Sequence, residues 1–186
     1  LAGTTVTATG EDGAARVLKT GDDVYLNDHI VSDAGGKAQL IFLDRSTLTL
    51  NQNTDLTLDK YVYDPSTAGG TMAVSSVKGA FRFVGGALSK KQPVTIKTPV
   101  ATIGIRGGIA DTNVTPGTGA SDAVFVYGDE LTMTNGNGDT FSTTQVGTGL
   151  MLDTPGGTPQ AMPAEMINQR MQSFGTSSPD SGDGTS

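Results

Sequence analysis

The sequence predicts an all-β protein: an elongated, solenoid-like or sandwich-like body of antiparallel or mixed strands, with one short amphipathic helix near the C-terminus. Hydrophobic residues make up only 35% of the 186 residues, below the roughly 45–50% of typical globular chains. Glycine (26 residues) and threonine (27 residues) are abundant; threonine favours strands and glycine favours turns. Apolar and polar residues also alternate in many short segments. Together these observations predict thin sheets rather than a thick core.

The predicted strands are segments in which every second side chain is apolar, the period of a half-buried strand. They are residues 4–9, 37–43, 46–50, 54–58, 71–77, 80–84, 94–97, 123–127, 130–134 and 140–146. Clusters of Gly, Asp and Asn separate them, which are turn signals. Short strands at this regular spacing are typical of all-β folds.

One helix is predicted over residues 163–174, because Pro163 suits a first helical position and Gly175 suits a helix end. Its apolar face consists of Met166, Ile167, Met171 and Phe174. This face is either a docking surface for a partner or a lid on the chain's own sheets, and we favour the lid. The predicted organisation is therefore a β domain over 1–159, a helix over 160–175 and a polar tail over 176–186.

Charge is distributed unevenly along the chain. Residues 1–106 have 11 Lys and Arg against 10 Asp and Glu, a net of +1, whereas residues 107–186 have one Arg against nine acids, a net of −8. The net charge of −7 argues against nucleic-acid binding, because phosphates repel an acidic chain. The asymmetry fits either head-to-tail association of copies or a solvated acidic surface.

The sequence offers little material for chemistry. It has no cysteine and one histidine, His29, without a nucleophile motif nearby, and its acidic clusters lie in turns. Residues 135–139, Asn-Gly-Asn-Gly-Asp, could contribute calcium ligands, but a single copy is more typical of a hairpin turn. We therefore predict no enzyme activity and no cofactor.

No segment reaches the roughly 18 apolar residues of a membrane span. The chain starts at Leu1 rather than Met, and with its acidity and its Thr and Gly content this favours an exported protein.

The segment 96–108, IKTPVATIGIRGG, is the most distinctive in the chain. Arg106 lies in an apolar run beside Gly104 and Gly107, and a guanidinium there requires hydrogen-bond acceptors. It could bind a carboxylate or phosphate ligand, or it could act as an internal clamp on backbone carbonyls. We favour the clamp.

Taken together, residues 21–65, 77–88 and 94–108 resemble the FecR domain family, most strongly over 15–110. The resemblance makes Pro99, Gly104, Arg106 and Gly107 a structural family signature. Two departures stand out. Asp44-Arg45-Ser46 replaces a frequent Asp-Gly-Ser, which predicts a changed turn, and Gly108 replaces a frequent Thr, which predicts a looser loop.

The resemblance implies a non-enzymatic, solenoid-like β domain outside the cytoplasm. In the best-known members this domain is part of an anti-sigma regulator that receives a signal from an outer-membrane transporter; other members are stand-alone exported proteins. The sequence shows neither a transmembrane helix nor a cytosolic helical part, so we expect a stand-alone protein of the cell surface, extracellular space or periplasm of a Gram-negative-type bacterium.

Two functions follow as expectations. The first is a self-associating structural subunit of a surface filament or layer, joined as a homo-oligomer through strand edges and charge-asymmetric ends. The alternative is a periplasmic FecR-type signalling or sensor module of an anti-sigma system. A polysaccharide-binding module is a weaker third possibility, because the chain has only four Tyr, six Phe and no Trp for sugar stacking.

Overall fold

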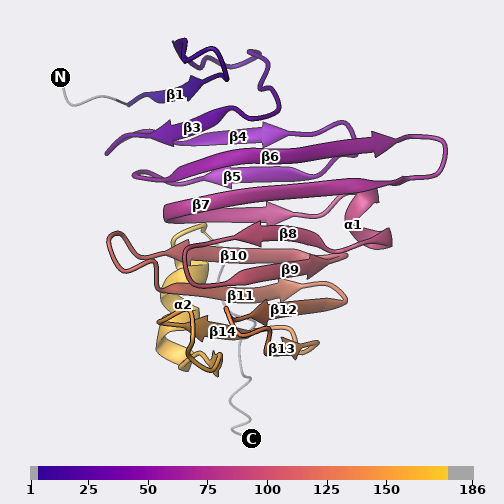
Figure 1. Ribbon diagram of the computed structural model, residues 1–186, viewed down its shortest axis with the longest axis vertical. Helices are drawn as coiled ribbons and strands as arrows, with labels where there is room; N and C mark the ends of the chain where they lie inside the picture. The colour runs from indigo at the N-terminus through magenta and orange to yellow at the C-terminus, as the bar shows by residue number, and fades with distance from the viewer. Residues whose placement is uncertain (1–3, 176–186) are drawn as a thin grey trace, which may run out of the picture.

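The computed structural model describes residues 4–175 as a β body with two short helices (Figure 1). The strands are β1 (Val6–Thr9), β2 (Ala15–Val17), β3 (His29–Ser32), β4 (Ala38–Ile41), β5 (Thr47–Leu50), β6 (Asp55–Asp64), β7 (Gly69–Val84), β8 (Val94–Lys97), β9 (Thr102–Arg106), β10 (Ile109–Val114), β11 (Ser121–Tyr127), β12 (Glu130–Thr134), β13 (Thr140–Thr143), β14 (Thr148–Leu152) and β15 (Gln160–Ala161). The helices are α1 (Ala87–Lys91) and α2 (Ala164–Gln172).

The strands form two sheets that share β7. Sheet A has the order β2–β1–β3–β6–β7–β8–β9–β12–β13, and sheet B has the order β4–β5–β7–β10–β11–β14–β15. All neighbours are antiparallel except β7 and β8. In Figure 1 the strands lie across the long axis of the molecule, stacked from β1 at one end to β13 at the other. The predicted elongated, mixed β body with one short C-terminal helix is confirmed.

Strand β7 passes from one sheet to the other at Gly79. Its first part, through Lys78, pairs with β6 and β8 in sheet A, and its second part pairs with β5 and β10 in sheet B. Gly79 has a φ of +99°, and a Cβ there would lie 2.4 Å from the Cα of Thr54. Glycine is required here both for the backbone conformation and for the close approach. This crossing joins the two sheets into one body.

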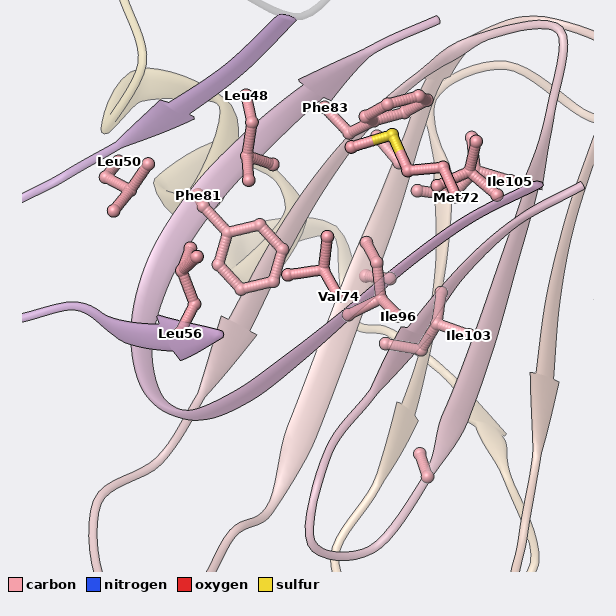
Figure 2. Packing of buried hydrophobic residues seen from close by; sticks show 14 of the residues in the cluster. Leu48, Leu50, Leu56, Met72, Val74, Phe81, Phe83, Ile96, Ile103 and Ile105 are labelled. Atoms are coloured by element: carbon pink, nitrogen blue, oxygen red, sulfur yellow. The ribbon is translucent and has the colours of Figure 1, made fainter. Parts of the chain in front are cut away.

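The core lies between the sheets and draws on alternate residues of nearly every strand. Met72 and Val74 of β7 point inward from sheet A, and Phe81 and Phe83 of the same strand point inward from sheet B. Figure 2 shows them packed together with Ile96, Ile103 and Ile105 of β8 and β9. The alternation that predicts the strands therefore also identifies the inward residues.

Several elements differ from the sequence prediction. Strands β2, β3, β9, β10, β14 and β15 lie outside the segments predicted from alternation. The alternation predicts 71–77 and 80–84 as separate strands, but they are one strand that changes sheets. Helix α1 was not expected, since five residues are too few to show a helical period. The predicted tail over 176–186 lies outside the described residues. Neither helix within residues 4–175 is long and apolar enough to cross a bilayer.

We expect Gly79→Ala to lower the free energy of unfolding by about 2 kcal/mol or more, because it adds backbone strain and a collision with Thr54. Gly117→Ala is the matched control, since Gly117 has a φ of +81° with no atom within 4 Å of an added Cβ. It should cost only about 1 kcal/mol. Urea unfolding of both variants measures the difference, and equal losses would contradict the crossing geometry.

Candidate functional site

Gly104 and Gly107 of the predicted signature lie where neighbouring groups pass close to the backbone. Gly104 lies on the outer face of β9, where a Cβ would approach the Oγ1 of Thr132 to 2.5 Å. Gly107 has a φ of +59°, and its N–H donates a 2.8 Å hydrogen bond to the carbonyl of Ser89 in α1. Pro99 lies in the turn between β8 and β9. These placements suit a structural role.

Arg106 does not form the internal clamp predicted for it. Strand β9 directs Ile103 and Ile105 into the core, and Arg106 ends the strand with its side chain 51% exposed. Its Nε lies 3.9 Å from the Oδ2 of Asp129, which is also exposed. The looser loop predicted at Gly108 is also wrong, because a Cβ there would lie 2.0 Å from the carbonyl oxygen of Tyr127.

Two other arginines, Arg82 and Arg170, form ion pairs with buried aspartates on the outer face of sheet B. Arg82 of β7 donates from Nε and Nη2 to the Oδ1 and Oδ2 of Asp111 at 2.5 and 2.6 Å. Arg170 of α2 donates in the same two-pronged way to Asp122 at 2.7 and 2.8 Å. Burial raises the pKa of Asp111, an effect that the hydrogen bonds from Arg82 only partly offset. Arg82 and Asp111 are direct cross-strand partners, which sequence reasoning could have found only with the register known.

Helix α2 packs its apolar face onto sheet B. Ile167 and Met171 are buried against Val124 and Met162, with Met166 partly buried beside them. The guanidinium of Arg82 lies 5.1 Å from the centre of the Phe174 ring. The four residues considered as a partner-docking face thus contact the chain's own sheet, and while α2 stays docked this face is not free to receive a partner.

The remaining candidates for chemistry are His29 and the turn at 135–139. The Nε2 of His29 is 2.7 Å from the Oδ1 of Asp55 on the outer face of sheet A. In the predicted hairpin turn at 135–139, the side-chain oxygen of Asn135 accepts the N–H groups of Asn137 and Asp139. Across the part of the chain that the structure describes, no three His, Cys, Asp or Glu side chains are grouped to hold a metal ion.

An open pocket of about 480 Å³ lies beside α1. It is lined by Leu43, Asp44, Arg45, Tyr63, Gly85, Gly86, Ala87 and Lys90. These residues come from the turn after β4, the far part of β6, the end of β7 and α1. The pocket therefore forms where the end of the shared strand meets the first hairpin of sheet B.

Asp44 fastens the two sides of this pocket together. Its buried carboxylate accepts hydrogen bonds from the N–H and hydroxyl of Ser46, from the hydroxyl of Tyr61 and from the N–H of Leu88. Its carbonyl accepts the N–H of Ala87 at 2.9 Å. Asp44 thus satisfies two N–H groups at the start of α1 that have no partner within the helix.

Arg45 keeps a glycine-like conformation. Its φ is +68°, so the changed turn predicted from the loss of glycine at this position is wrong. A side chain in this left-handed region is strained relative to glycine. Arg45 and Lys90 are exposed, and neither makes an ion pair with any residue between 4 and 175. The pocket therefore presents two unneutralised cations, which suit a carboxylate or another anion.

Replacing Arg170 tests how α2 is held. We expect Arg170→Ala to lower the free energy of unfolding by about 3 kcal/mol, because it leaves the buried carboxylate of Asp122 unpaired. The double variant with Asp122→Ala should recover part of this loss, with a coupling energy of about 1 to 3 kcal/mol. Additive losses in urea unfolding would show that the pair does not hold the helix.

Tyr61 gives a pH-dependent test of the pocket wall. Burial, with the nearby Asp44 carboxylate, raises the pKa of Tyr61 to about 12 from 10.0. A raised pKa means that the folded state favours the neutral phenol, so its stabilisation is complete below pH 10 and is lost as the pH rises towards 12. The stability difference between the wild type and Tyr61→Phe should shrink across this range in equilibrium unfolding. A constant difference would contradict this environment.

Comparison with solved structures shows the fold. The chain is similar to two crystal structures from Parabacteroides distasonis ATCC 8503, both of a protein named as an anti-sigma factor. The TM-scores are 0.52 and 0.51 and the sequence identities 13% and 11%, each over 72% of this chain. The chain spans only 58% of the length of each of those structures. The comparison with curated proteins gives no match.

The family model described as FecR protein matches residues 28–129, more than half of the chain. With the two structural matches, it contradicts the predicted self-associating subunit of a filament or layer and favours the alternative, a signalling or sensor module. The resemblance seen in the sequence is confirmed: the chain belongs to the FecR family.

Proposed function

We propose that this chain is a non-catalytic signalling or sensor module of an anti-sigma regulatory system, placed outside the cytoplasm and acting by contact with other proteins. The match to the FecR family carries the proposal. The fold shared with a protein named as an anti-sigma factor supports it. The acidic net charge of −7 favours protein partners over nucleic acids.

The architecture suits a relay by contact. One continuous hydrophobic core contains side chains from strands at both ends of the body. A partner that binds at one end therefore contacts a body that is packed as a single unit. The ion pairs that Arg82 and Arg170 form with buried aspartates connect neighbouring elements of the fold, so their charged groups are already engaged within the chain. This arrangement therefore supports a function in binding other proteins better than a function in catalysis.

Deletion in the native bacterium tests the proposal. We expect an in-frame deletion of the codons for residues 1–186 to change the transcription of a limited gene set that shares one sigma-factor promoter. A signalling module acts on one regulator, so RNA sequencing should show a restricted response that the restored wild-type codons reverse.

Restored codons with Lys97→Gln provide the control, because Lys97 is an exposed residue on the outer face of sheet A, away from the pocket. A transcript profile that is unchanged by the deletion, during growth and under envelope stress, would contradict the proposed function.

A further inference from the structure

We propose that β4, the open edge of sheet B, receives an extended acidic segment of a partner protein, whose carboxylates bind Arg45 and Lys90. The proposal deepens the proposed function and rests on it for the statement that the partner is a protein. Three observations on this part of the molecule carry it: the unpaired strand edge, the exposed apolar side chains beside it and the two cations at its end.

The edge of β4 is available for pairing. Within residues 4–175, strand β4 pairs with β5 and with no other strand. The N–H of Phe42 donates to the carbonyl of Ser46 at 2.9 Å, so by alternation Leu40 bonds to β5 while Gln39 and Ile41 direct their N–H and C=O groups outward. No backbone group between residues 4 and 175 bonds these outward groups. An unpaired row of this kind is the template for adding a strand.

Apolar side chains stand exposed beside this edge. Ile41 is 71% and Leu43 is 85% exposed, the two largest values among the large hydrophobic residues of the described chain. Both alternate with Leu40 and Phe42, which face the core. A strand added to β4 would place every second side chain on the same face as Ile41, where apolar residues could cover it.

The charges at the edge select the occupant. Arg45 and Lys90 face the pocket at the end of β4, and Lys37 precedes the strand at its other end. The acid of the pocket, Asp44, has both carboxylate oxygens occupied by its own chain. The edge is therefore complementary to a segment that alternates apolar and acidic residues. The backbone of Arg45 is in the left-handed region at a cost in strain, which also indicates a use for its guanidinium.

A labelled peptide tests the proposal directly. The probe is a fluorescein-tagged peptide with three Val-Glu repeats, and the protein is the full chain, titrated by fluorescence anisotropy. We expect saturable binding of the Val-Glu peptide and none of a peptide with three Val-Lys repeats. The double variant Arg45→Gly with Lys90→Gln should weaken binding at least about tenfold, since it removes both charge partners.

The variants separate the edge from general effects. Arg45→Gly suits the positive φ of the turn, so this variant should fold. Ile41→Pro removes an outward N–H that β5 does not use, and it should also weaken binding at least about tenfold. Lys60→Gln with Lys97→Gln, two exposed lysines outside the pocket, is the matched control and should bind like the wild type. Circular dichroism confirms the fold of each variant.

The peptide experiment tests the β4 edge site, and the deletion experiment tests the signalling function. Failure of the Val-Glu peptide to bind, or binding that survives both the double variant and Ile41→Pro, would overturn the edge site. If the deletion in the bacterium still alters the gene set, the signalling function stands without it. If the peptide binds as expected and the deletion has no effect, the edge is a peptide site and the signalling function fails.

Discussion

Strand β7 forms hydrogen bonds in both sheets, and the rest of the structure depends on this shared strand. Strand β7 pairs with β6 and β8 before Gly79 and with β5 and β10 after it. Its inward side chains therefore come from both walls of the core, and its outward Arg82 reaches the partner that lies beneath α2. Where β7 ends, Gly85 and Gly86 lead directly into α1, so the same strand also positions the pocket.

The arginines differ in whether they form an ion pair with a buried aspartate of the same chain. Arg16, Arg82 and Arg170 each donate to a buried aspartate, respectively Asp28, Asp111 and Asp122. Hydrogen bonds from Arg16 and from the N–H of Tyr25 outweigh the opposing effect of burial and lower the pKa of Asp28. Arg45 has no such partner within the described chain. Charge that packing has not neutralised remains available at the surface, which is why the pocket beside α1, and not the buried pairs, is the candidate for recognition.

The sequence predicts what depends on short-range periodicity and misses what depends on register. Alternation identifies most strands, and spacing of three to four residues identifies α2, because each pattern is local. The bond from the N–H of Leu88 to Asp44 spans 44 residues, and the contact of Arg82 with Asp111 needs the alignment of β7 with β10. The apolar residues around Arg106 predict a clamp, but its position at the end of β9 exposes its side chain to solvent. The unusual turn at Asp44-Arg45-Ser46 was visible in the sequence; its contact with a helix of five residues was not.

Helix α2 has a consequence for the order in which the chain can complete its fold. The carbonyl of Ser173 accepts a hydrogen bond from Asn51 across 122 residues, and Arg170 reaches Asp122 across 48. The hairpins of both sheets can pair before α2 is present, but Asp122 has the guanidinium of Arg170 beside it only once α2 has docked. Docking of α2, which follows every strand of residues 4–175, is therefore a non-local step, of the kind that slows the folding of β proteins. An interrupted chain would leave an acidic group and an apolar sheet face uncovered, which a protease or chaperone of its compartment could distinguish from the finished protein.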